Sequence, residues 1–143
     1  MQKIETTILE KLKSIDSINF LSKYSINSFI LFGSLNNGEF TEESDVDLAI
    51  ICEEKMNLEN ILEIELYFED ILKREIDVID LKSDSLDLFL KINILNNGKV
   101  LYTRDENKVL EEFKNAVDWI YRENKDYIFF RKRDVLGWIK KGL

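Results

Sequence analysis

The 143-residue chain lacks histidine and proline and contains one cysteine and five glycines. Without histidine the protein cannot use a Ser-His-Asp triad, a histidine general base or a histidine-based zinc site. Its chemistry must therefore come from carboxylates, hydroxyls or amines. The single cysteine, Cys52, excludes an internal disulfide and fits a reducing compartment, so we expect a cytoplasmic protein.

Long apolar runs are also missing. No segment approaches the roughly 18 uninterrupted apolar residues of a membrane span, and the N-terminal residues mix charged with apolar side chains, unlike a signal sequence. We therefore expect a soluble protein with no membrane contact. The chain has 28 acidic and 20 basic residues, a net charge of −8, which disfavours general binding to nucleic acid.

The composition fits one domain. Apolar residues make up 45% of the chain and aromatic residues 11%, enough to close a single packed core. No linker rich in proline or serine and no internal repeat interrupts the sequence. We expect one domain over residues 1–143, with a C-terminal helical segment from about residue 105 to 143.

Apolar periodicity predicts the order of the elements. Helices are expected at about 3–23, 57–74, 83–97 and, as one helix or two, 105–141, and strands at about 26–32, 45–50, 76–81 and 99–103. Asn57 is a candidate N-cap for the second helix, and residues 35–44 form a polar loop. This alternation predicts a compact α/β (α+β) domain, with helices packed on a sheet.

Two acids in the second expected strand, Asp45 and Asp47, are candidate metal ligands. Side chains two residues apart on a strand leave the same face, with Cα atoms about 6–7 Å apart. Such a pair supplies the hard oxygen ligands that Mg²⁺ prefers, and two Mg²⁺ ions can stabilise both the attacking and the leaving oxygen at phosphorus. The alternative is that both acids lie on a solvated strand face.

The turn Gly33-Ser34, which follows the first expected strand, strengthens the interpretation of Asp45 and Asp47 as metal ligands. Glycine permits a tight turn, and backbone N–H groups together with the Ser34 hydroxyl can hold a triphosphate. The alternative role for Ser34 is that of a helix N-cap.

The full pattern consists of Gly33-Ser34, ten intervening residues, then Asp45-Val46-Asp47, and an acid on a later strand. It resembles the minimal nucleotidyltransferase (MNT) branch of the DNA-polymerase-β-like superfamily. The resemblance implies a small mixed β-sheet with helices packed on it, and a nucleoside triphosphate as substrate. It also implies that Asp45, Asp47 and a third carboxylate are catalytic and bind two Mg²⁺ ions. Asp77 is the expected third carboxylate, with Asp80 as its competitor.

The sequence departs from the family at one position. Many relatives place a basic residue directly after the Gly-Ser pair, where this chain has Leu35. The basic residues that would neutralise the phosphates therefore stay unassigned.

The small size resembles the antitoxin half of the HEPN/MNT toxin–antitoxin pairs. This implies that AMP is transferred from ATP to a tyrosine of a partner HEPN toxin. A transferase acting on a small molecule such as an antibiotic, and an antitoxin that neutralises its partner by contact alone, are the alternatives. The contact hypothesis is based on the aromatic and arginine residues of the C-terminal segment: Trp119, Tyr121, Tyr127, Phe129, Phe130, Arg131, Arg133 and Trp138. Of the aromatics, Phe113 and Trp119 are expected in the core.

Overall fold

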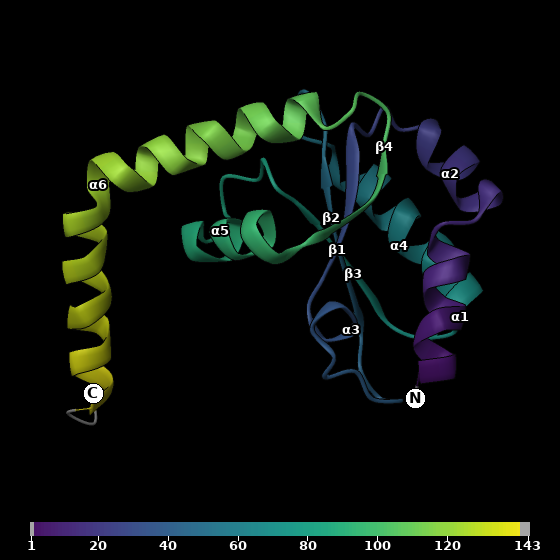
Figure 1. Cartoon of the computed structure of the whole chain (residues 1–143), viewed down its shortest axis with the longest axis horizontal. Coiled ribbons are helices and arrows are strands. Elements are labelled where there is room, and N and C mark those ends of the chain that lie inside the picture. Colours follow the sequence, from purple (N-terminus) through teal and green to yellow (C-terminus); the bar gives the residue numbers. More distant parts are fainter. Residues whose placement is uncertain (1, 141–143) are drawn as a thin grey trace. The chain divides into compact units, whose positions relative to one another are not determined.

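A computed structural model describes the backbone of residues 2–140 and the side chains of residues 4–124 (Figure 1). The chain divides into two compact units, residues 1–111 and 112–143. The elements, in order, are α1 (Gln2–Leu12), α2 (Ile15–Ser22), β1 (Ser28–Phe32), α3 (Ser34–Asn37), β2 (Val46–Ile51), α4 (Leu58–Leu72), β3 (Ile76–Asp80), α5 (Leu88–Asn97), β4 (Lys99–Thr103) and α6 (Lys108–Lys140).

The four strands form one mixed sheet in the order β3-β2-β1-β4. β1 runs antiparallel to both of its neighbours, while β2 and β3 are parallel and are connected through α4. The mixed sheet with helices packed on it confirms the predicted fold class. β4 lies at one edge of the sheet.

One face of the sheet carries the main hydrophobic core. Phe29 of β1 and Leu48 of β2 pack there with Ile64 and Phe68 of α4, and all four are fully buried. The rings of Phe29 and Phe68 stack with their centroids 5.5 Å apart. α1 contributes Leu12 to the same core, and Figure 1 shows α1 and α4 on one side of the sheet and α5 on the other.

The first expected helix, at about residues 3–23, is divided into α1 and α2. Ser14 caps α2 because its hydroxyl accepts a hydrogen bond from the backbone N–H of Ser17 at 3.2 Å. This local cap outweighs the continuous apolar periodicity on which the single helix was predicted.

Three other boundaries are informative. Asn57 caps α4 as predicted, by accepting from the N–H of Asn60 at 2.9 Å. The expected loop at 35–44 instead begins within the short helix α3, which ends at Asn37 and is capped by Gly38 with φ 86°. α5 begins later than predicted because the Asp87 side chain caps it.

The C-terminal segment forms one helix, α6, from Lys108 to Lys140. Trp119 is 57% exposed, so the expectation that it lies in the core was wrong, whereas Phe113 is partly buried. The side chains from Tyr127 onward lie outside the described residues. Among the helices within residues 2–140, none combines the length and hydropathy that a membrane crossing requires.

Candidate active site

Two of the predicted acids lie side by side on neighbouring strands. In the parallel register of β2 and β3, the Cα partner of Asp47 is Asp77, and on the other side Asp47 pairs with Phe32 of β1. Residues paired in register project to the same face of a sheet. The face that holds both carboxylates is the one opposite the Phe29 and Leu48 side chains of the main core.

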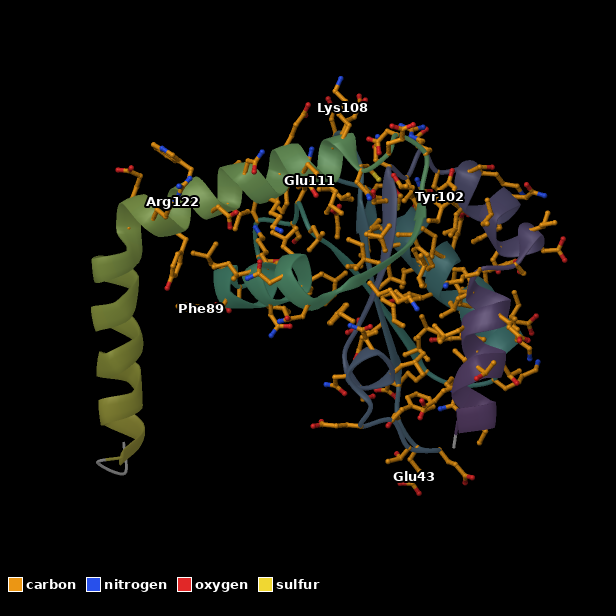
Figure 2. The ribbon with its side chains drawn as sticks, viewed as in Figure 1. Glu43, Phe89, Tyr102, Lys108, Glu111 and Arg122 are labelled. Atoms are coloured by element: carbon orange, nitrogen blue, oxygen red, sulfur yellow. The ribbon has the colours of Figure 1, made fainter. Side chains whose placement is uncertain are left out.

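Asp45 directly precedes β2, which begins at Val46, so it lies outside the strand in which it was predicted. It still lies two residues before Asp47 and is exposed. Glu43, labelled in Figure 2, marks the loop that leads into this end of β2.

The charge of Asp47 is unfavourable in the isolated protein. Burial raises the pKa of this carboxyl above its ordinary value, and the nearby charges of Asp77 and Asp45 raise it further. Asp47 with its two acidic neighbours, in a chain without histidine, provides hard oxygen donors, and a divalent cation there would favour the ionised form of Asp47. Within the described residues, no three Cys, Asp or Glu side chains already form a metal-binding cluster. Asp45 and Asp77 are therefore near enough to affect the charge of Asp47, but the three carboxylates do not converge on one point.

Gly33 brings the turn after β1 against Asp47. Its backbone has φ 80° and ψ −157°, a conformation that side chains resist. A Cβ atom built on Gly33 would overlap Oδ2 of Asp47 and would lie 3.1 Å from both Cβ and Cγ of that residue. Glycine is therefore required here both for the backbone conformation and for the close approach to the carboxylate.

Ser34 is the first residue of α3, and the N-cap is Gly33, so the alternative role of Ser34 as N-cap was wrong. The main chain of the turn is held by the Gly33 carbonyl, which accepts from the N–H groups of Asn36 and Asn37, each at 3.1 Å. Among the described residues, no hydrogen bond to the Ser34 hydroxyl was found. Leu35 is buried in the core, so the position at which the resemblance implied a basic residue is used here for packing.

The two candidates for the third carboxylate have different surroundings. Asp80 is 5% exposed, and its carboxylate accepts hydrogen bonds from the backbone N–H groups of Met56 at 2.8 Å and Lys82 at 2.9 Å. Asp77 is exposed and lies on the face that holds Asp47. Asp80 therefore stabilises loops around the end of β3, and Asp77 is the acid available to a ligand.

Arg74, which the sequence did not indicate, fixes the turn before Asp45. Its Nη1 donates to the carbonyl oxygen of Ser44 at 3.0 Å, and its guanidinium lies 4.8 Å from the ring centroid of the buried Phe40. The turn is closed by the Ser44 hydroxyl, which accepts from the N–H of Thr41 at 2.9 Å. Arg74 and Ser44 are 30 residues apart in the sequence, so no local pattern could have revealed this contact.

Residues 13–107, more than half of the chain, match the family model described as "Polymerase beta, Nucleotidyltransferase". The chain belongs to this family. Among curated proteins it is similar to two from Methanocaldococcus jannaschii, each named "Putative protein adenylyltransferase". It is 39% identical to one over 57 residues, which are 40% of this chain and 58% of that protein. It is 40% identical to the other over 78 residues, which are 53% of this chain and 74% of that protein.

Two solved structures share the fold of this member of the nucleotidyltransferase family. One is a crystal structure of a toxin–antitoxin with AMP-PNP, which matches with a TM-score of 0.70 and 21% identity over 83% of this chain and 94% of that one. The other is a tri-AMPylated Shewanella oneidensis HEPN toxin in complex with MNT antitoxin, with a TM-score of 0.66, 19% identity and coverage of 89% and 98%. These likenesses confirm the polymerase-β-like fold predicted from the sequence.

Proposed function

We propose that this protein is a Mg²⁺-dependent adenylyltransferase that moves AMP from ATP to a tyrosine of a partner HEPN toxin and so acts as an antitoxin. The observation that carries the proposal is the juxtaposition of Asp47 and Asp77 on one sheet face, near Asp45 and against the Gly33-Ser34 turn. Membership of the nucleotidyltransferase family supports the reaction class, and the names of the curated relatives support AMP as the transferred group.

Asp45, Asp47 and Asp77 would hold the metal. Their carboxylate oxygens suit Mg²⁺, and the raised pKa of Asp47 indicates a position where added positive charge is favourable. When bound, a pair of such ions supplies charge stabilisation for the attacking and leaving oxygens of an in-line displacement at phosphorus.

The protein's own groups then position ATP and the acceptor. In the proposed reaction, the acceptor hydroxyl oxygen forms a bond to the α-phosphorus, the bond between that phosphorus and the bridging oxygen of pyrophosphate breaks, and pyrophosphate leaves. The exposed Asp77 takes the hydroxyl proton. The Ser34 hydroxyl and the backbone N–H groups of its turn contact the triphosphate. No covalent enzyme intermediate is required.

The choice of ATP and of a protein acceptor is supported by the toxin–antitoxin structures that share the fold, one with AMP-PNP and one with a tri-AMPylated HEPN toxin.

One observation favours a second candidate, an antitoxin that neutralises by contact. Two aromatic side chains of α6 are exposed, Trp119 at 57% and Tyr121 at 41%, and the neighbouring Ile120 is 43% exposed. Exposed tryptophan and tyrosine side chains anchor many protein interfaces.

A transfer assay separates these functions. The protein is incubated with Mg²⁺ and each α-labelled nucleoside triphosphate in turn, with and without the product of the neighbouring gene. We expect label from ATP on that partner, dependent on Mg²⁺ and lost in Asp77→Asn. Neutralisation of the partner without label, by wild type and by Asp77→Asn alike, would show instead that the protein acts by contact.

A further inference from the structure

Three leucines of α4 lie exposed along one line. Leu58, Leu62 and Leu66 are 69%, 48% and 64% exposed, and their spacing of four residues places them one above another on the helix surface. The same helix buries Ile64 and Phe68 against the sheet. Since a step of two residues turns about 200° around a helix, the leucines point away from the sheet and from the core.

Carboxylates border this apolar line on both sides. α4 contains five acidic residues and no basic one, namely Glu59, Glu63, Glu65, Glu69 and Asp70. At about 100° per residue, Glu59, Glu63 and Asp70 follow one edge of the line and Glu65 the other, while Glu69 lies on the line itself, after Leu66. The leucine face, defined as Leu58, Leu62 and Leu66 with these five acids, is therefore apolar between Leu58 and Leu66 and negative along its edges and at its C-terminal end.

A cavity opens at the N-terminal end of the leucine face. It has a volume of about 370 Å³, and Met56, Leu58 and Ile61 form its apolar wall. Asp80 and Asp84 supply carboxylates to the lining, and Lys55 lies there too, in a salt bridge of 2.7 Å with Asp84. A partially apolar hollow next to an exposed apolar line can receive an anchoring side chain, the feature on which helix-in-groove contacts depend.

We propose that the leucine face binds an amphipathic helix of a different protein, with apolar residues at matching helical spacing and lysine or arginine residues along their edges. Charge complementarity selects this occupant. A second copy that docked through the same face would bring five carboxylates against five, in a chain whose net charge is already −8. A basic helix would neutralise the carboxylates while covering the leucines.

The leucine face is separate from the candidate active site. α4 packs on the sheet face that carries Phe29 and Leu48, whereas Asp47 and Asp77 project from the opposite face. A helix bound to α4 therefore leaves the carboxylates accessible to ATP and acceptor. The proposed docking goes beyond nucleotide transfer and holds whether or not the bound protein is the acceptor.

The test uses the full chain and a synthetic, fluorescently labelled peptide designed as a lysine-flanked amphipathic helix with leucines at i, i+4 and i+8. The variant Leu58→Gln/Leu62→Gln/Leu66→Gln removes the apolar line but keeps helix propensity. Ile15→Gln, at an α2 position that is 77% exposed, is the matched control for loss of exposed apolar surface elsewhere. Circular dichroism and Mg²⁺-dependent ATP binding report on the fold and the active site of each protein.

We expect wild type and Ile15→Gln to bind the peptide equally, and the triple variant to bind it at least about tenfold more weakly while its fold and ATP binding are unchanged. Equal binding by the triple variant would overturn the proposal, as would equal binding of a peptide in which glutamate replaces lysine. Light scattering provides a further check, because self-association of wild type that the triple variant abolishes would make a second copy the occupant and refute the proposal.

Discussion

Gly33→Ala should disrupt the active site more than the fold, because Gly33 lies against Asp47. Its φ of 80° and ψ of −157° lie in a region that is essentially restricted to glycine, and a side chain forced into it costs on the order of 1–3 kcal/mol. The added Cβ would also overlap Oδ2 of Asp47, so the turn or the carboxylate must move. We expect stability to fall by roughly this amount and AMP transfer to be lost.

Gly38→Ala is the matched control. Gly38 also has a positive φ, 86°, but a Cβ at this position would meet nothing within 4 Å. Left-handed backbone costs a non-glycine residue about 1–2 kcal/mol, so the two variants should unfold at similar denaturant concentrations. Only Gly33→Ala should lose transfer and Mg²⁺-dependent ATP binding. If both variants keep wild-type transfer and binding, the contact between Gly33 and Asp47 has no part in the site.

Metal-free Asp47→Asn should melt above wild type at about pH 7, because the folded state raises the pKa of Asp47 and its ionised form is therefore destabilising at higher pH. This gain in melting temperature should vanish below about pH 3.8, the ordinary pKa of an aspartate, because both states then carry a protonated Asp47. An unchanged difference in melting temperature at that pH would refute the prediction. Asp80→Asn should lower the free energy of unfolding by about 1–3 kcal/mol through its two backbone hydrogen bonds, whereas Asp77→Asn should abolish transfer with little loss of stability. If Asp80→Asn instead abolishes transfer and Asp77→Asn instead lowers stability, Asp80 is the third carboxylate. Ser34→Ala should weaken ATP binding by about 1–3 kcal/mol in titrations and leave the denaturation midpoint unchanged.

The sequence predicted the parts of the site that depend on local periodicity. Apolar patterns predicted the strands that hold Asp47 and Asp77, and the parallel register of β2 and β3 then showed that the two residues lie side by side. The resemblance favoured Asp77 over Asp80, and the two residues, three apart on β3, do face opposite ways. The contact of Arg74 with Ser44 could not be predicted in this way, because it depends on how distant segments meet.

α4 illustrates a second limit. Its apolar residues occupy two sides of the helix, and both sides satisfy helical spacing. Burial of Ile64 and Phe68 and exposure of Leu62 and Leu66 are decided by the sheet on which α4 packs. Periodicity therefore predicted the helix, but the three-dimensional fold was needed to separate its core side from its outward side.

Mass spectrometry of the partner toxin tests the central claim most directly. The proposed HEPN partner is incubated with ATP and Mg²⁺ and either wild type or Asp47→Asn, and its intact mass and tyrosine-containing peptides are then measured. The account predicts the gain of AMP on a tyrosine with wild type, and none with Asp47→Asn or when Mg²⁺ is chelated. An unmodified partner that wild type has nevertheless neutralised, or equal modification by Asp47→Asn, would contradict it.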